Sequence, residues 1–144
     1  MDSPDPDAVR ADIARFWNVS PAQEEDAAAD AWEALDRATT LRRAGRDGPR
    51  WAEARLAEGL ARLYVTRQVA EWGNRSYALQ ALEAAIDGLR DAVAGLPEDF
   101  DPPPAEVAAF REAVLLEWRA GQSEPTQDRY AALSIPALRR ATRK

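Results

Sequence analysis

The sequence predicts an all-α protein, a compact bundle of about five helices packed around one buried central helix. Apolar residues recur at spacings of three and four along several segments, which is the pattern of helices with one buried face. Prolines and glycines separate these segments, as expected at helix ends. No segment shows the sustained alternation of apolar and polar residues that is typical of strands. At 144 residues, the chain fits a single helical domain over 1–144.

The central helix is expected over 49–72, because Pro49 suits a first helical turn and Gly73 suits a helix end. At 100° per residue, its apolar residues fall on two opposite sides. One side holds Ala52, Leu56, Gly59, Leu60, Leu63 and Ala70, and the other holds Trp51, Ala54, Ala61, Val65, Val69 and Trp72. A surface helix has a single apolar stripe, so two stripes predict neighbours on both sides.

Four further helices are expected around this one, over about 5–17, 20–44, 76–95 and 104–121. After Gly121 the sequence predicts a short irregular segment with a small helix near Tyr130, a break at Pro136, and a flexible basic tail over 139–144. The expected inward residues are Val9, Ile13, Phe16 and Trp17; Ala28, Ala31, Trp32, Leu35 and Ala38; Leu79, Leu82, Ile86, Leu89, Val93 and Leu96; and Val107, Phe110, Val114 and Trp118. Leu116 points away from the last of these faces, so part of its side chain is expected in solvent.

The residue types that are missing exclude much enzyme chemistry. The chain has no His and no Cys, and its single Lys is Lys144. These absences remove the usual general base, the thiolate nucleophile and most zinc sites. We therefore expect no catalytic residues, no metal site and no cofactor. The acidic N-terminus lacks the apolar core of a signal peptide and the chain has no cysteine, so we expect a cytoplasmic protein. No apolar run approaches the roughly 20 residues that a membrane span needs. The Ala- and Arg-rich composition predicts a bacterial source.

Charge is unevenly distributed along the sequence. Residues 37–75 hold nine arginines and four acids, a net charge of +5, whereas residues 1–36 and 76–138 carry −8 and −7. One interpretation is that the arginines pair with carboxylates of neighbouring helices and orient the bundle. The other is a partner-binding surface, formed by Arg42, Arg43, Arg46, Arg50, Arg55 and Arg62 or by a face around Leu116.

The binding interpretation predicts a non-enzymatic accessory or adaptor protein whose partner is a protein with an acidic surface. A sequence pI of about 4.8 disfavours nucleic acid, whose phosphates the flanking acids would repel. Homo-oligomerisation remains open. One alternative is a Mg²⁺-dependent nucleotide hydrolase that uses helix carboxylates, for which the acidic row Glu83, Asp87 and Asp91 is a candidate, although this row lies away from the apolar face. A second alternative is a regulator that binds an apolar ligand in a pocket lined by the five tryptophans.

Two resemblances bear on function. The helical hairpins are similar to tetratricopeptide repeats, but the helices over 20–44 and 49–72 are too long for that unit and no second copy follows at its period. The stretches WEALDRATTLRRAG and ARLAEGLARLYVTR, within 32–67, resemble small all-helical accessory proteins of bacterial conflict systems with caspase-like and tetratricopeptide partners. That resemblance implies a non-enzymatic role in binding a partner.

Overall fold

The computed structural model describes residues 5–45, 49–123 and 128–142. These ranges contain eight α-helices, one 3-10 helix and no strand, which confirms the all-α class. The α-helices are α1 (Pro6–Trp17), α2 (Glu24–Ala29), α3 (Ala31–Ala44), α4 (Pro49–Glu71), α5 (Arg75–Gly95), α6 (Pro104–Ser123), α7 (Asp128–Ala131) and α8 (Ile135–Ala141), and the 3-10 helix is Pro21–Gln23. The expected number of about five helices is too low, because one predicted helix is divided in two and two short helices follow α6.

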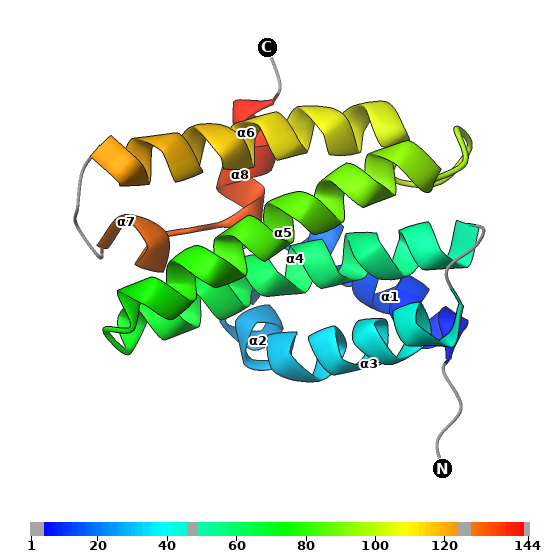
Figure 1. The fold of residues 1–144 in the computed structure, drawn as a ribbon, viewed down its shortest axis with the longest axis horizontal. Coiled ribbons are helices and arrows are strands. Elements are labelled where there is room, and N and C mark those ends of the chain that lie inside the picture. Colours follow the sequence, from blue (N-terminus) through cyan, green and yellow to red (C-terminus); the bar gives the residue numbers. More distant parts are fainter. Residues whose placement is uncertain (1–4, 46–48, 124–127, 143–144) are drawn as a thin grey trace.

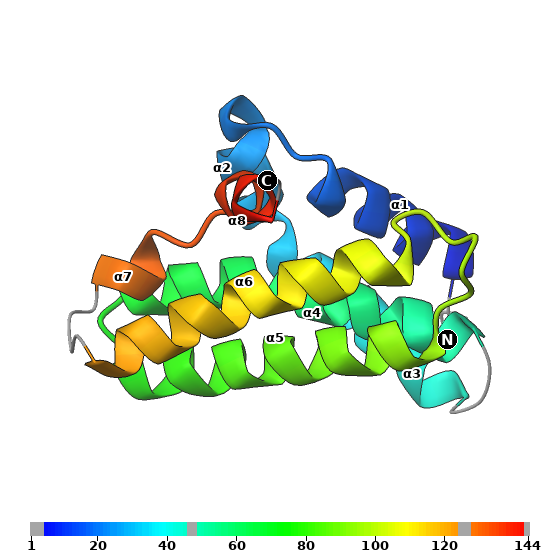
Figure 2. The ribbon, with the colours of Figure 1, turned by 90° about the horizontal axis from the view of Figure 1, so that it is seen from above.

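The four longest helices form one layer, in the order α3, α4, α5, α6, and each runs antiparallel to its neighbour (Figure 1). Figure 2 shows α1, α2 and α8 together on one side of this layer. The helix α4 packs against α1, α2, α3, α5 and α7, which makes it the centre of the bundle. None of the described helices is both long and apolar enough to cross a membrane.

The expected central helix is confirmed by the burial of α4. All six residues over 56–61 are buried, Leu60 is fully inaccessible and Val65 is 2% exposed. Almost every residue of the two predicted stripes is buried; the exceptions are Trp51, which is half-buried, and Trp72, which is 66% exposed. Residues outside both stripes are buried as well, so α4 is covered on more than two sides.

The helix α4 ends where the sequence predicts, at a glycine cap. Gly73 has a positive φ of 83°, a conformation that glycine adopts without a steric penalty. Its backbone N–H donates to Ala70 O at 3.0 Å, and the N–H of Asn74 donates to Val69 O at 3.0 Å. These two hydrogen bonds form a Schellman motif. The side chain of Asn74 then caps α5 by accepting from the N–H of Tyr77.

Two glycines let α4 and α5 approach closely. A Cβ atom on Gly88 of α5 would lie 2.9 Å from Arg55 O and 3.3 Å from the backbone nitrogen of Gly59. A Cβ atom on Gly59 would meet Ala85 O at 3.1 Å. The backbones therefore pass each other at a point where no side chain fits between them, and this contact fixes how α5 lies on the central helix.

The helix predicted over 20–44 is divided at Asp30, so that prediction is wrong in its continuity. Asp30 ends α2 and precedes α3, and it accepts a hydrogen bond from Arg15 of α1. Glu24 of α2 is buried and pairs with Arg67 of α4. These contacts between helices turn α2 away from α3, and no proline or glycine marks the break in the sequence.

Two tryptophans expected in the core are exposed instead. Trp32 is 38% exposed, and its ring stacks on that of Trp72, with the centroids 6.4 Å apart and the planes 7° from parallel. The indole nitrogen of Trp32 donates to Gln68 of α4. The buried face of α3 is formed by Ala31, Ala34, Ala38 and Leu41. This face is rotated from the predicted stripe, and the rotation places Trp32 at the edge.

The C-terminal segment also differs from the prediction. Pro136 does not break a helix but lies in the first turn of α8, where its missing N–H costs nothing. Ser134 caps this helix by accepting from the N–H of Ala137. Arg139, expected in a flexible tail, lies in α8, donates to Trp17 O at 2.9 Å and stacks over the Trp17 ring. Of the predicted tail, residues 143–144 lie outside the described ranges.

Candidate functional site

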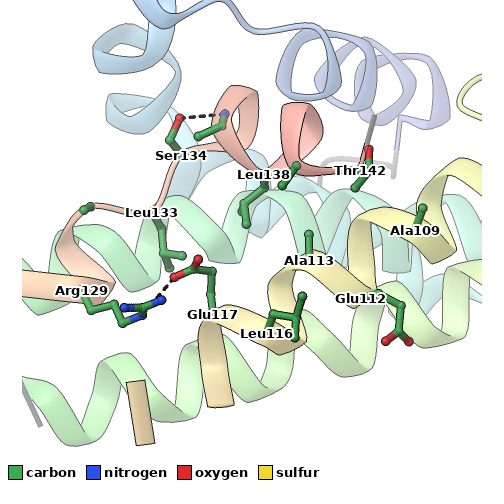
Figure 3. Close-up of a pocket in the computed structure, with 13 residues that line it drawn as sticks. Ala109, Glu112, Ala113, Leu116, Glu117, Arg129, Leu133, Ser134, Leu138 and Thr142 are labelled. Atoms are coloured by element: carbon green, nitrogen blue, oxygen red, sulfur yellow. Dashed lines mark hydrogen bonds and ion pairs between the residues drawn. The ribbon is translucent and has the colours of Figure 1, made fainter. Parts of the chain in front are cut away.

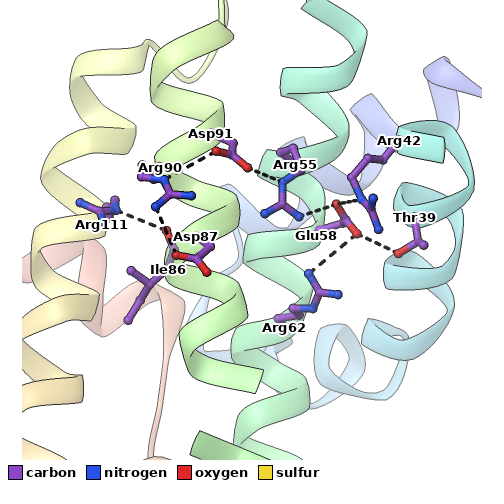
Figure 4. Close-up of polar contacts among 10 residues, drawn as sticks. All are labelled: Thr39, Arg42, Arg55, Glu58, Arg62, Ile86, Asp87, Arg90, Asp91 and Arg111. Atoms are coloured by element: carbon purple, nitrogen blue, oxygen red, sulfur yellow. Dashed lines mark hydrogen bonds and ion pairs between the residues drawn. The ribbon is translucent and has the colours of Figure 1, made fainter. Parts of the chain in front are cut away.

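Three of the candidate arginines converge on one buried carboxylate, Glu58 of α4 (Figure 4). Arg42 of α3 donates to Glu58 at 2.8 Å, and Arg55 donates to the same oxygen at 3.0 Å. The Arg62 guanidinium lies 3.8 Å from the other carboxylate oxygen, which is beyond hydrogen-bond distance. Glu58 is completely inaccessible to solvent. We call these residues, together with Thr39, which donates to Glu58 at 2.9 Å, the Glu58 cluster.

The Glu58 cluster continues onto α5 through Asp91. Arg55 donates to Asp91 at 2.9 Å, and Asp91 also lies 3.6 Å from Arg90, which in turn faces Asp87. This joined network has four guanidinium groups and three carboxylates, a net charge of +1 within a chain of net charge −6. The central face between α3 and α5 is therefore locally positive.

The pairing of arginines with neighbouring helices, one of the two interpretations from sequence, accounts for much of this arrangement. Arg55 joins α4 to α5, and Arg42 joins α3 to α4. Elsewhere, Arg67 of α4 pairs with Glu24 at 3.0 Å and with Glu25 at 2.9 Å. These pairs orient the helices around α4. Arg42 and Arg55 donate N–H groups to carboxylates within the bundle, and an external partner would need the same N–H groups.

The remaining candidate arginines lie apart from the Glu58 cluster or outside the described residues. Arg43 at the end of α3 and Arg50 at the start of α4 are exposed, and the structure records no carboxylate partner for either within its described ranges. Arg46 lies outside those ranges. The expected six-arginine surface is thus brought together only in part, as the three residues around Glu58.

Leu116 of α6 lies at the edge of an apolar groove (Figure 3). It is 63% exposed, as its position on the helix predicts. The groove has a volume of about 730 Å³ and runs between α6 and the segment containing α7 and α8. Its apolar lining is formed by Ala109, Ala113, Leu116, Ala132, Leu133, Ala137, Leu138 and Ala141. We call this the α6–α8 groove.

Among the described residues that line the α6–α8 groove, the charged side chains are Glu112, Glu117 and Arg129, an excess of one negative charge. Glu117 of α6 pairs with Arg129 at 3.1 Å, so these two charges offset each other. Glu112 is exposed on the same helix, and the Arg111 guanidinium lies 4.0 Å from its carboxylate. Two hydroxyl residues, Ser134 and Thr142, complete the lining. The groove is therefore an apolar channel with an acidic α6 edge.

The acidic row considered as a magnesium site does not converge. Glu83 and Asp87 are exposed on α5, whereas Asp91 is engaged by Arg55 and Arg90. In the part of the chain that the structure describes, no three acidic side chains lie close enough to hold a metal ion. This geometry gives the hydrolase alternative no supporting cluster among those residues.

The tryptophans do not gather around a common cavity. Trp32 and Trp72 stack on the surface, while Trp17 is buried against Phe110, with a centroid distance of 5.2 Å. Trp51 and Trp118 are half-buried on different helices, α4 and α6. The expected Trp-lined pocket therefore gains no support, and the α6–α8 groove has no tryptophan in its lining.

Tyr64 of α4 is a buried titratable group beside Phe16 of α1 and Glu24 of α2. Burial raises the pKa of its hydroxyl well above the ordinary tyrosine value, and the negative charge of Glu24 raises it further. Because this pKa is higher in the folded chain than in the unfolded chain, the neutral Tyr64 hydroxyl makes its full contribution to stability below about pH 10, the ordinary tyrosine value. This contribution is lost as the pH rises above that value. We expect the free energy of unfolding to fall above pH 10, with a limiting slope of about 1.4 kcal/mol per pH unit from this residue.

Urea unfolding from pH 8 to pH 11.5 measures this effect, with Tyr64→Phe as the matched control. Phenylalanine keeps the ring that packs against Phe16 and removes the ionisable hydroxyl. The variant should lose less stability than the original chain over the alkaline range. Equal alkaline slopes for the two proteins would show that Tyr64 does not titrate in this way.

Glu58 is not among the candidate residues predicted from the sequence, although the chain contains a signal for it. Arg55, Glu58 and Arg62 are spaced by three and four residues, so they form one line along a helix. Neighbouring helices cover the two apolar sides of such a helix. A line of polar residues between these sides therefore lies between the neighbouring helices rather than in open solvent. The stacked pair Trp32 and Trp72 has no comparable signal in the sequence, because it joins two helices that are distant along the chain.

The fold defines the protein as a single-layer core of four long helices covered on one side by shorter ones. Comparisons with protein-family models, with curated proteins and with solved structures find no match to the chain. The functional interpretation therefore rests on the Glu58 cluster and the α6–α8 groove themselves.

Proposed function

We propose that this protein is a non-enzymatic accessory or adaptor protein that binds an amphipathic helix of a partner protein in the α6–α8 groove. The observation that carries the proposal is an apolar groove of about 730 Å³ with a leucine at its edge that is 63% exposed. An amphipathic helix laid in an apolar groove is a recurrent mode of recognition between proteins. Such a partner would cover Leu116 and remove its apolar surface from water.

The shape of the groove favours a helix over a less regular segment. Ala109, Ala113 and Leu116 follow one another along α6 at spacings of four and three, and α8 supplies Ala137 and Ala141. Small alanine side chains allow a helix to approach closely, and the leucines provide larger surfaces for its apolar side chains. The α6 helix has 20 residues, enough to support a partner helix of about four turns.

The charge of the groove favours a partner helix with basic residues beside its apolar face. Glu112 is exposed at the α6 edge, and the whole chain carries a net charge of −6. Opposite charges across an interface speed association and disfavour wrong partners. The acidic partner expected from the sequence suits the arginine surface and not this groove. A role in a bacterial conflict system, implied by the resemblance over 32–67, remains part of this proposal.

The variant Leu116→Arg tests the groove. It places a positive charge at the edge of the apolar surface, so a partner captured from the native host by the original chain should be lost. Because Leu116 is largely exposed, the free energy of unfolding should change by about 0.5 kcal/mol or less. Affinity capture followed by mass spectrometry measures the binding, and urea unfolding measures the stability.

Trp72→Arg is the matched control, because it removes an equally exposed apolar side chain and adds the same charge on another surface. It should leave capture intact. A photoreactive residue at Ala137, an exposed position in the groove, should crosslink to a helical, basic segment of the captured protein, whereas the same group at Glu83 on α5 should not. Capture that survives Leu116→Arg, or that Trp72→Arg abolishes instead, would reject the groove as the binding surface.

A further inference from the structure

A positive charge within the Glu58 cluster lacks a full partner. Arg42 and Arg55 both hydrogen-bond to Glu58, and Arg55 also holds Asp91. Among the described residues, the only ion pair of Arg62 is its 3.8 Å contact with the same Glu58. One carboxylate thus serves three guanidinium groups, and the charge left uncompensated is that of Arg62.

Burial makes this uncompensated charge costly. The Arg62 side chain is only 23% exposed. Burial lowers the pKa of its guanidinium, Arg55 and Arg42 lower it further by repulsion, and Glu58 counters only part of this. Even so, guanidinium stays protonated at neutral pH. An external anion that reached Arg62 would therefore gain the interaction that the bundle does not supply.

The position of Arg62 leaves it reachable. It lies on the line of α4 that faces the space between α3 and α5, with its guanidinium directed toward Glu58 (Figure 4). Tyr77, which is 45% exposed in the first turn of α5, is close enough to interact electrostatically with Arg62. Because 23% of the Arg62 side chain is exposed and its 3.8 Å contact with Glu58 is too long for a hydrogen bond, an oxyanion could contact Arg62 without breaking the hydrogen bonds that Glu58 accepts from Arg42 and Arg55.

We propose that Arg62, supported by Arg42 and Arg55, forms a binding site for a small oxyanion, a phosphate or a carboxylate. Guanidinium groups bind planar carboxylates and tetrahedral phosphates through paired N–H donors. The site lies on α4 and goes beyond the proposed groove, which is formed by α6, α7 and α8. Its bound anion would bring the charge of the seven-residue network from +1 to zero or below.

Two probes separate the sources of the oxyanion. Inorganic phosphate represents a phosphate group, and glutamate blocked at both backbone ends represents a carboxylate side chain. The Nε–Hε signals of Arg42, Arg55 and Arg62 are followed by NMR as each probe is added at constant ionic strength. We expect saturable shifts in the millimolar range, largest at Arg62, and the tighter of the two probes identifies the source.

The variant Arg62→Gln should weaken binding of the tighter probe by about tenfold or more, read from the Arg42 and Arg55 signals. It should also keep or raise the free energy of unfolding in buffer without the probe, because it removes repulsion among the three arginines. Arg43→Gln, at an exposed arginine of α3, is the matched control and should change neither quantity. Shifts that do not saturate for either probe, or that persist unchanged in Arg62→Gln, would overturn the proposal.

Discussion

Replacing Glu58 with glutamine should lower the free energy of unfolding by about 3–5 kcal/mol, the usual cost of removing one partner from a buried ion pair. Glu58 is fully buried and is the shared counter-charge of Arg42, Arg55 and Arg62. Without it, three guanidinium groups face one another in a partly dehydrated space. Urea unfolding followed by circular dichroism measures the loss, and the helical signal before the transition verifies that the variant folds.

Asp87→Asn is the matched control for this prediction. It also removes one carboxylate charge, but Asp87 is exposed and its only recorded contact within the described part of the chain is with Arg90 at 3.7 Å. A surface pair of this kind contributes about 1 kcal/mol or less. Adding Arg62→Gln to Glu58→Gln should recover part of the lost stability, since it removes one of the repelling charges. Equal losses for Glu58→Gln and Asp87→Asn would contradict the role assigned to the buried carboxylate.

The variant Gly88→Val should destabilise the protein by about 3 kcal/mol, because its side chain would collide with the backbone of α4. A Cβ atom at this position lies 2.9 Å from Arg55 O, and a backbone atom cannot rotate out of the way as a side chain can. Helix propensity acts in the opposite direction, since replacing a helical glycine favours the helix by up to about 1 kcal/mol. We expect the collision to be the larger effect.

Urea unfolding measures the balance, with Gly45→Val as the control. Gly45 follows α3 and has an extended backbone with φ of −171°, and no atom of the described residues lies within 4 Å of a Cβ built on it. The control should therefore change the stability by about 0.5 kcal/mol or less. If Gly88→Val proves as stable as the original chain, the backbones of α4 and α5 do not approach as closely as a 2.9 Å contact at this position requires.

The sequence was sufficient for the class of fold and for the longest helices. Pro49 and Gly73 mark the ends of α4, because proline fits a first turn and glycine accepts a positive φ. The regular spacing of Leu82, Ile86 and Leu89 predicts the buried face of α5, and all three residues are buried. These features depend on local backbone chemistry and on helical periodicity, which a single sequence contains.

The features that the sequence did not predict depend on contacts between helices. The break at Asp30 follows from pairing with Arg15 and from the burial of Glu24, and no local helix breaker accompanies it. The same break rotates α3, so that Trp32 is exposed. Of the two candidate surfaces, the sequence predicted the exposure of Leu116, but the groove beside it requires α8, which forms because Pro136 begins a helix.

The central claim is that α4 is enclosed by the other helices and forms the core of the bundle. Native-state hydrogen exchange tests it most directly. The backbone amides over 56–65 should exchange only through global unfolding, so their free energy of exchange should equal the free energy of unfolding measured in urea. The amides of Leu82 and Leu89 in α5 should behave in the same way. Exchange of the 56–65 amides through local opening, at a free energy well below that of α5, would contradict the claim.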